Sequence, residues 1–357
     1  MPLTESQVIA ALRTVQDPEL FKDIVTLGMV KGVQIDGSRV SVRVELTTPG
    51  CPLKDVIERD VTNALRRAGA EQVQVELTAN VRGPAQPRQG AALPQVKNVI
   101  AIGAGKGGVG KSTLALNLAV GLRRCGAKVG LMDGDIYGPS MPTMLGIKGV
   151  APQLRENKIV PHHVHGIHAI TIGSIVPEDK PLIWRGPMAH GAFKQLLLDN
   201  TEWPELDYLI VDLPPGTGDV PLTLCQLLPL TGAVVVATPQ QVALDDAIRA
   251  AGMFQQLGAP ILGFIENMSY FVAPDGTEHD IFGRGGTEKA AQQLGLPFLG
   301  AIPMFTELRI NSDHGKPEWN FTTNPKLREA LERVTRHLAG EVSKRNLQGP
   351  GPQLNIS

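Results

Sequence analysis

The sequence predicts an α/β protein with a mostly parallel sheet and helices on both of its faces, preceded by a small α+β domain. Two observations carry this prediction. Residues 84–95, PAQPRQGAALPQ, have no hydrophobic period and are rich in residues typical of linkers, so we expect a linker over 84–96. After it, short apolar runs alternate with helical stretches, a pattern typical of a parallel sheet covered on both faces.

The small domain is expected to span residues 1–83. Two stretches have helical spacing, TESQVIAALRTV and LKDVIERDVTNALRRAG. Two others alternate like half-buried strands, RVSVRVELTT and QVQVELT. Helices and strands in this order predict a compact α+β unit that ends near residue 83.

The larger domain is expected to span residues 97–343. Its predicted strands are the apolar runs NVIAIG, KVGLMD, IHAITIG, YLIVDL, AVVVAT and ILGFIE. Its predicted helices include TLALNLAVGLRRC, GAFKQLLLD and QVALDDAIRAAGMFQQL. Because strands and helices alternate, we expect successive strands to run parallel.

A final helix, PKLREALERVTRHLAGEV, carries an apolar stripe formed by Leu327, Leu331, Val334 and Leu338. Such a stripe is typical of a helix that docks on its own domain, and also of one that binds a membrane. Acids and bases are mixed on the polar face, and a polar tail is expected over residues 344–357. These features favour docking within the protein.

The composition excludes several classes of protein. The net charge of −1 provides no field that would recruit nucleic acid or an anionic membrane, and only 4% of residues are aromatic. The stretch MPLTESQVIAALRTV lacks a basic flank and apolar core, so we expect no signal peptide. Three scattered cysteines, Cys51, Cys125 and Cys225, form no disulfide framework and favour a reducing, cytoplasmic location.

The segment GKGGVGKS, residues 105–112, matches the P-loop pattern between a predicted strand and a predicted helix. Glycines let the backbone approach phosphates, and the N–H groups of the loop and helix start bind the anion. Lys111 is expected to reach the β- and γ-phosphates of ATP, and the Ser112 hydroxyl to bind Mg²⁺. The alternative is a glycine-rich turn without a ligand. The expected ATP-binding residues are Gly105, Lys106, Gly107, Gly108, Val109, Gly110, Lys111, Ser112 and Thr113.

Acidic residues follow two other predicted strands. Asp212 ends the run YLIVD, where a carboxylate that serves Mg²⁺ belongs. Asp133 and Asp135 follow the run VGLM, and we favour Asp135 as the group that orients the attacking water. Capping of a strand end or helix remains an alternative for Asp135.

Lys106 is a second cation at the entrance of the same loop. Because Lys111 already serves the nucleotide of its own chain, we predict that Lys106 points to the phosphates of a neighbouring chain. An arginine finger acting in this way accelerates hydrolysis roughly 10³–10⁵-fold. A solvated loop lysine is the alternative. This interpretation predicts a homodimeric, slow and switch-like ATPase, with Lys106, Lys111 and Asp135 as its catalytic residues.

These motifs together resemble a known family. KGGVGKST is similar to the deviant P-loop of dimeric ATPases, and DGDIYGPSMPTMLG, IWRGPM, DLPPGTGD, ENMSYF and IFGRGG resemble the Mrp/ApbC-type iron–sulfur cluster carriers. DPELFKDIVTLGMV and TTPGCPL resemble the cluster-assembly domain of bacterial members. The resemblance implies ATP hydrolysis, an iron–sulfur cargo, and partners that are apoprotein acceptors and an assembly scaffold. It also implies that Asn267 contacts adenine, for which a turn or capping role is the alternative.

The sequence departs from the family in one segment. Between ENMSYF and IFGRGG many members carry a Cys-x-x-Cys pair that holds a bridging cluster. This chain has VAPDGTEHD there, in which APDG predicts a tight turn. Clusters are held by thiolates, so we expect none to bind at this position.

Cys51 is the remaining candidate for a cluster ligand. It precedes Pro52 and a predicted helix, whose N-terminus would stabilise a thiolate. We expect it to hold a labile cluster with ligands from another chain; a buried, inert thiol is the alternative. Cys125 and Cys225 are predicted core residues. Four histidines, His162, His163, His165 and His168, are expected in a solvated loop that leads into a strand, and metal binding is the alternative.

The leading hypothesis is an ATP-dependent iron–sulfur cluster carrier or assembly factor. A cluster-independent, ATP-gated maturation adaptor is the second. A spatial regulator of the septum-positioning type is the third, and it would need a lipid-binding tail. We expect no nucleic-acid and no membrane partner.

Overall fold

The computed structural model describes residues 3–17, 22–46, 54–83, 93–135, 138–174, 194–273 and 275–347. The chain divides into two compact units, Met1–Arg82 with Ser343–Ser357, and Gly83–Val342. The final helix α10 (Pro325–Leu347) extends into the stretch for which the sequence predicts a polar tail.

The smaller unit is built on a three-stranded sheet in the order β3 (Val30–Asp36), β4 (Arg39–Leu46), β5 (Gln72–Ala79). β3 runs antiparallel to β4, and β4 runs parallel to β5. Helices α1 (Glu5–Leu12) and α2 (Lys54–Arg67) contribute apolar side chains to the core of this unit. Every second residue of β4 is buried, which is the alternation that RVSVRVEL predicts. A short pair, β1 (Gln16–Asp17) and β2 (Lys22–Asp23), completes the unit among the described residues.

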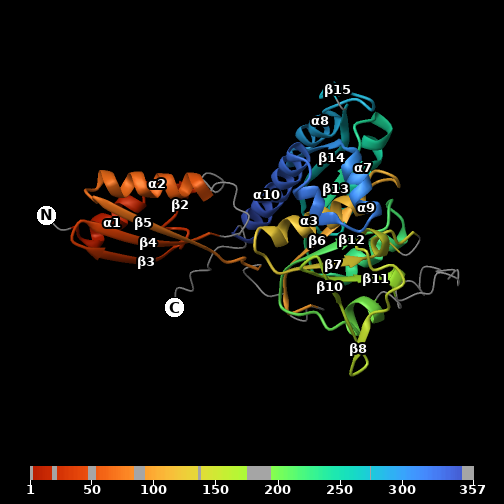
Figure 1. Ribbon diagram of the computed structural model, residues 1–357, viewed down its shortest axis with the longest axis horizontal. Helices are drawn as coiled ribbons and strands as arrows, with labels where there is room; N and C mark the ends of the chain where they lie inside the picture. The colour runs from red at the N-terminus through yellow and green to blue at the C-terminus, as the bar shows by residue number, and fades with distance from the viewer. Residues whose placement is uncertain are drawn as a thin grey trace. The chain divides into compact units, whose positions relative to one another are not determined.

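The larger unit contains a central sheet, in which nine strands are found among the described residues (Figure 1). Its order is β10 (His162–Val164), β11 (Ile167–Thr171), β7 (Val129–Asp133), β12 (Leu206–Asp212), β6 (Val96–Gly103), β13 (Leu230–Ala237), β14 (Ile261–Val272) and β15 (Glu278–His279), with β16 (Phe298–Met304) also paired to β14. The pairs from β11 to β14, and β14 with β16, are parallel. The two end pairs, β10–β11 and β14–β15, are antiparallel.

Helices cover both faces of this sheet. α3 (Lys111–Arg124) packs on β6, β7 and β12. The opposite face is covered by α6 (Asp219–Leu227) and α7 (Gln241–Gln256), which share an apolar cluster with the sheet. In the described ranges the larger unit also contains α4 (Met141–Met144), α8 (Gly286–Gln293), α9 (Thr306–Asp313), the 3₁₀ helices η1 (Ile172–Ser174) and η3 (Pro317–Phe321), and the π-helix η2 (Lys194–Asp199). The predicted α/β class, with a mostly parallel sheet and a small α+β unit, is confirmed.

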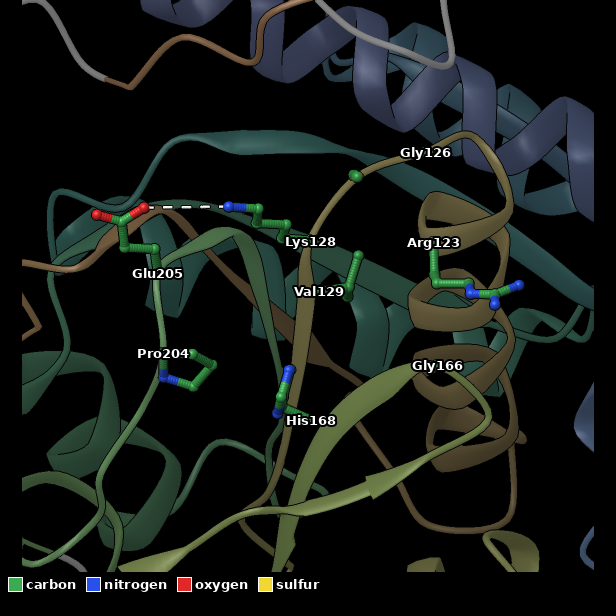
Figure 2. A pocket seen from close by; sticks show the side chains of 9 residues that line it. Arg123, Gly126, Lys128, Val129, Gly166, His168, Pro204 and Glu205 are labelled. Carbon is green, nitrogen blue, oxygen red and sulfur yellow. Dashed lines mark ion pairs between the residues drawn. The ribbon is translucent and has the colours of Figure 1, made fainter.

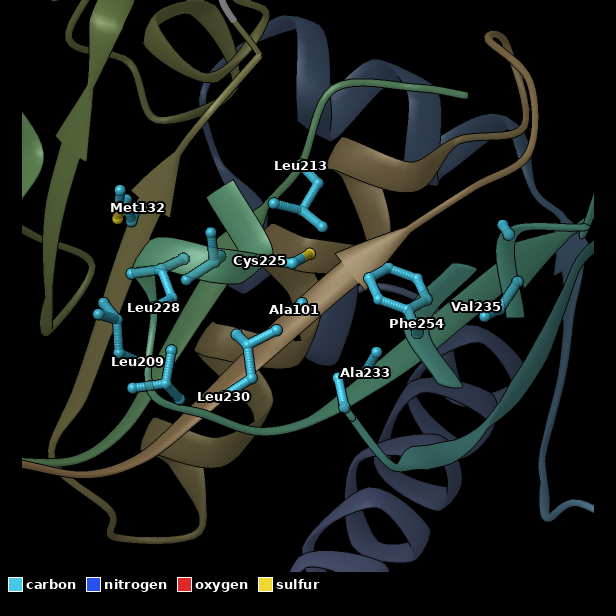
Figure 3. Packing of buried hydrophobic residues seen from close by; sticks show 14 of the residues in the cluster. Ala101, Met132, Leu209, Leu213, Cys225, Leu228, Leu230, Ala233, Val235 and Phe254 are labelled. Atoms are coloured by element: carbon cyan, nitrogen blue, oxygen red, sulfur yellow. The ribbon is translucent and has the colours of Figure 1, made fainter. Parts of the chain in front are cut away.

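Figure 3 shows the apolar cluster on the α6–α7 face. Ala101 of β6 and Ala233 of β13 leave room for Phe254 of α7, whose ring is 1% exposed. A side chain at Gly103 would collide with this ring, because a Cβ there would lie 2.6 Å from Phe254 Cζ. Cys225 and Leu228 fill the same layer beside Leu209 and Leu213. This packing holds the ends of the parallel strands in place.

Three local expectations differ from the structure. Three of the four histidines lie in strands, because His162–Val164 and Ile167–Thr171 form the antiparallel hairpin β10–β11, and His165 lies in the turn between them. The prediction of a loop was therefore wrong for His162 and His163, because His165 and Gly166 adopt positive φ angles of 53° and 72°, which turn the chain back on itself. Lys194–Asp199, within the predicted helix GAFKQLLLD, forms a π-helix. The strands β3 and β16 were not predicted.

Candidate functional site

The predicted phosphate loop connects the end of β6 at Gly103 to the start of α3 at Lys111. The first turn of a helix leaves N–H groups unpaired, and these attract an anion. Gly110 is the residue before this turn and has a φ of 81°, which favours glycine. A Cβ at Gly110 would also lie 2.2 Å from Asn267 Nδ2, so this glycine is required by packing as well.

Lys111 lies in the centre of a cluster of acids. Its Nζ is 2.6 Å from Asp212 Oδ1 and 3.8 Å from Asp135 Oδ2. It also donates to Ser112 Oγ at 3.1 Å. The register of the sheet explains why the ends of these strands lie together, because Asp212 of β12 pairs with Asp133 of β7 and with Ile102 of β6. The structure thus brings together the predicted residues of the phosphate loop and the two strand ends.

Two acids of this cluster, Asp133 and Asp212, are buried. Burial raises the pKa of Asp212 above its ordinary value, and the neighbouring Lys111 opposes this rise. Burial, with repulsion from Asp212, raises the pKa of Asp133 to about 7. Asp212 Oδ2 is buried without a hydrogen-bond partner. This oxygen and the Ser112 hydroxyl are the oxygen donors that Mg²⁺ prefers, so the residues fit that ion.

Asp133 fixes the loop that carries Asp135. One of its carboxylate oxygens accepts the backbone N–H of Asp135 at 3.0 Å, and the other accepts the Thr171 hydroxyl at 2.6 Å. Thr171 is fully buried and in turn accepts the N–H of Gly173 at 3.1 Å. Thr171 was not predicted, because its role depends on β11 lying beside β7. Asp133 and Thr171 thus anchor the loops that follow β7 and β11 at this edge of the sheet.

Lys106 differs from Lys111 in its surroundings. It is partly exposed at the entrance of the loop, and it forms no ion pair within the described part of the chain. Its neighbour Gly105 is packed directly on α7, because a Cβ there would lie 2.1 Å from the carbonyl oxygen of Asp246. The loop entrance is therefore fixed by its backbone, while the Lys106 side chain has no fixed partner in these ranges.

Asn267 reaches the phosphate loop from β14. Its Nδ2 donates to the carbonyl oxygen of Val109 at 2.8 Å, and its side chain is almost fully buried. Its Oδ1 is buried without a hydrogen-bond partner. The amide thus has one end bound to the loop and one end with an unused acceptor.

The segment 272–280, for which the sequence predicts no cluster ligand, includes the end of β14, the strand β15 and the chain between them. Gly276 donates its N–H to the carbonyl oxygen of Ala273 at 2.8 Å, as predicted for a tight turn, although Pro274 lies outside the described residues. Arg284 stacks over the Tyr270 ring with 3.5 Å to its centroid and pairs with Glu278 at 2.6 Å. Ring stacking and ion pairs close this hairpin.

The cysteines and histidines contribute little to the described site. Cys51 and the motif IWRGPM lie outside the described residues. Cys225 is buried, and burial raises the pKa of its thiol to about 12. Cys125, predicted to be a core residue, is only partly buried at the end of α3. No three histidine, cysteine or acidic side chains in the described ranges are arranged to hold a metal ion.

A hollow of about 600 Å³ lies at the opposite edge of the sheet (Figure 2). It is lined where β7 and β11 begin, by residues that include Arg123, Lys128 and His168. Lys128 and Glu205 form an exposed ion pair of 4.0 Å across it. Because this is the amino end of the parallel strands, the hollow is separate from the phosphate loop, and no predicted site residue lines it.

A parallel sheet with a phosphate loop after β6 and acids at the ends of β7 and β12 defines a P-loop nucleotide-binding domain. A family model described as NUBPL iron-transfer P-loop NTPase matches residues 95–339, and one described as iron–sulfur cluster assembly protein matches residues 5–77. The chain belongs to the iron-transfer P-loop NTPase family. The predicted resemblance to the iron–sulfur cluster carriers is confirmed.

Two similar proteins match almost the whole length of the chain. The iron–sulfur cluster carrier protein of Deinococcus radiodurans is 49% identical over 352 residues, which are 98% of this chain and 99% of that protein. The protein of the same name from Synechocystis is 47% identical over 348 residues, 96% of this chain and 98% of its own. A solved nucleotide-binding protein from Archaeoglobus fulgidus, in complex with ADP, has a TM-score of 0.58 and 34% identity, and covers 67% of this chain and 93% of its own.

Proposed function

We propose that this protein binds and hydrolyses ATP in order to carry iron–sulfur clusters and deliver them to apoprotein acceptors. The observation that carries the proposal is the contact of 2.6 Å between Lys111 Nζ and Asp212 Oδ1 beside the phosphate loop. It is supported by two carriers that are nearly half identical to this chain over almost all of its length.

Residues 105–113 bind the phosphates of ATP. The backbone N–H groups at the start of α3 face the anion, and Lys111 exchanges the Asp212 carboxylate for the β- and γ-phosphate oxygens. Ser112 and Asp212 would hold Mg²⁺ through their side-chain oxygen atoms. Once bound, the ion would supply positive charge that offsets the negative charge of the phosphates.

Hydrolysis depends on two further side chains. Asp135, held by Asp133, orients the attacking water. Lys106 acts on the phosphates of a second copy in a homodimer, which is supported by its partly exposed position at the loop entrance. Because each site is complete only in the dimer, hydrolysis is slow and switch-like.

Asn267 contacts the adenine base. Its Oδ1 lacks a hydrogen-bond partner, and a carboxamide oxygen accepts well from the amino group of adenine. The other end of the amide remains bound to Val109.

The cargo is held by Cys51, with further ligands from another chain or an assembly scaffold. Cys225 is a poor alternative, because a thiol with a pKa of about 12 is protonated near neutral pH and thiolates are the cluster ligands. We place the protein in the cytoplasm, where thiols stay reduced. None of the described helices is both long and apolar enough to cross a bilayer. We propose neither a nucleic-acid nor a membrane partner.

The test is cluster transfer from the reconstituted protein to an apo-ferredoxin, followed by absorption and circular dichroism, with and without ATP and Mg²⁺. We expect transfer from the wild type that changes with nucleotide and an altered response in Lys111→Ala. A protein that hydrolyses ATP but never holds iron would support the cluster-independent adaptor. ATP-dependent sedimentation with liposomes would support the spatial regulator.

A further inference from the structure

Glu266 of β14 is a carboxylate with no exposed surface and no cation beside it in the described part of the chain. Three donors satisfy it. Ser269 Oγ donates at 2.5 Å and the N–H of Gly285 at 2.9 Å, both to Oε1, and the N–H of Thr287 donates to Oε2 at 2.9 Å. Gly285 and Thr287 lie at the start of α8, where unpaired N–H groups favour a negative charge. Glu266 therefore anchors the first turn of α8 to β14.

The same carboxylate fixes an irregular piece of β14. The pairing of β14 with β16 shifts register between Asn267 and Phe271, and Met268 between them has a φ of 53°. A positive φ is unfavourable for methionine and persists only where neighbouring contacts hold it. The bond from Ser269 to Glu266 spans this irregular residue. It is thus one contact that holds the bulge in its observed shape.

The bulge directs Asn267 to the phosphate loop. Asn267 Nδ2 donates to the carbonyl oxygen of Val109 at 2.8 Å, and Val109 is only 3% exposed. In a phosphate loop the N–H groups must face the anion, so carbonyls turn away and need partners elsewhere. A buried carbonyl that loses its donor is costly, and the loop would then populate other conformations.

We infer that Glu266 is a positioning residue for the nucleotide: through the Met268 bulge it holds Asn267 on the Val109 carbonyl, and it joins the phosphate loop to the first turn of α8. This inference rests on the proposed nucleotide site at residues 105–113. It predicts that nucleotide binding and the order of Gly285 and Thr287 are coupled, although neither residue belongs to the phosphate loop. Coupling of this kind is reciprocal.

The first test measures the affinity of Mg·ADP by calorimetry for Glu266→Gln, Asn267→Ala and the double variant. Glutamine keeps the size of Glu266 but presents an amide donor to backbone N–H groups. We expect about tenfold weaker binding in Glu266→Gln, because one buried hydrogen bond is strained, and at least about tenfold weaker binding in Asn267→Ala, which also loses the proposed contact with adenine. The double variant should bind no more than about twofold more weakly than Asn267→Ala. The reason is that both changes interrupt the same series of contacts from Glu266 to the phosphate loop.

The second test follows hydrogen exchange of the Gly285 and Thr287 amides with and without Mg·ADP. The nucleotide should slow their exchange in the wild type, and this effect should be lost in Asn267→Ala. If Glu266 had a purely structural role, Glu266→Gln would change the exchange of these two amides equally with and without Mg·ADP. Glu288→Gln is the matched control, since Glu288 is an exposed acid in the same first turn of α8 and should behave as the wild type.

Wild-type affinity in a folded Glu266→Gln variant would overturn the inference, as would fully additive losses in the double variant. If Glu266→Gln does not fold, Ser269→Ala removes one of the three donors and should weaken binding about threefold; unchanged affinity and unchanged nucleotide-dependent exchange in it would overturn the inference equally. If Lys111→Ala binds Mg·ADP like the wild type, the proposed nucleotide site itself is wrong.

Discussion

Lys111 Nζ lies 2.6 Å from Asp212 Oδ1 in a site where Lys111 is 6% exposed and Asp212 has no exposed surface. The lysine of the phosphate loop and the acid at the end of β12 therefore hold one another in place. A charge left alone there would be costly, since removing one partner of a buried pair is strongly destabilising. Each of the two residues consequently affects both nucleotide binding and the stability of the fold.

Lys111→Ala is expected to weaken ATP binding by at least about a hundredfold, because the phosphates lose charge-assisted hydrogen bonds worth roughly 3 kcal/mol. Calorimetry with ATP and Mg²⁺ measures this loss. Lys289→Ala, a change at an exposed lysine of α8, is the control and should leave affinity unchanged. Affinity like that of the wild type in Lys111→Ala would show that ATP binds elsewhere.

Lys106→Ala is expected to keep most of its ATP binding and to lose most of its hydrolysis. The reason is that Lys111 still serves the nucleotide of its own chain, whereas the other copy loses a cation near its phosphates. Steady-state phosphate release, measured beside calorimetry, separates the two effects. A mixture of Lys106→Ala and Asp135→Ala chains should regain part of the activity, because one site of a mixed dimer is intact. Absence of recovery, with mixed dimers demonstrated, would contradict action between chains.

Cys51→Ser is expected to lower the iron and sulfide bound after anaerobic reconstitution. The chain has only three cysteines, whereas a cluster takes about four thiolate ligands, so the cluster should be labile and need ligands from elsewhere. The double variant Cys125→Ser/Cys225→Ser is the control and should keep its iron. Unchanged iron in Cys51→Ser would disprove the assignment.

Cys225 is expected to resist alkylation in the folded protein from neutral pH up to strongly alkaline pH. The thiolate is the reactive form, and a pKa of about 12 leaves it scarce until pH approaches that value. The variant Cys51→Ser/Cys125→Ser isolates this thiol for mass spectrometry with iodoacetamide. The same variant in denaturant should react readily at moderately alkaline pH. Rapid labelling of the folded variant near neutral pH would show that Cys225 is accessible as thiolate.

Gly105→Ala is expected to lower the thermal midpoint of unfolding, whereas Gly107→Ala should change it little. A Cβ at Gly105 would lie 2.1 Å from the Asp246 carbonyl, while one at Gly107 would meet nothing within 4 Å. Overpacking of this kind costs about 1–3 kcal/mol. Calorimetric unfolding of both variants makes the comparison. Equal midpoints would mean that α7 moves away from the loop without cost.

The phosphate loop and the class of the fold could be predicted because both depend on local patterns. A phosphate loop can be recognised from its own glycine-rich residues. Apolar runs that alternate with helical stretches predict a parallel sheet without any knowledge of the contacts between them. The acids Asp133 and Asp212 were also predictable, since both directly end such runs. Their position side by side follows from the parallel register, which places the ends of neighbouring strands at one edge, where Asp212 pairs with Lys111.

Other parts of the fold and of the site could not be predicted, because they depend on contacts between segments that are distant in the sequence. Thr171 becomes important only when β11 lies beside β7, and Glu266 only when the start of α8 folds back on β14. In the sequence, Glu266 is simply the acid at the end of an apolar run. The strand β16 was missed because FLGAIPM contains glycine and proline, which weaken the pattern of a strand. The histidine hairpin was missed because its turn places His165 at a positive φ, which is uncommon for residues other than glycine.

The β14–β15 hairpin is closed by Arg284, Tyr270 and Glu278, and its sequence contains no cysteine. Oxidants that dismantle clusters and convert thiols to sulfenic or sulfinic acids find no target at this end of the nucleotide-binding unit. In residues 83–342 the only thiols are Cys125 and Cys225, and burial raises the pKa of both. Oxidative stress should therefore remove the cargo of this protein and spare its capacity to bind ATP, so that it can be loaded again without being made anew.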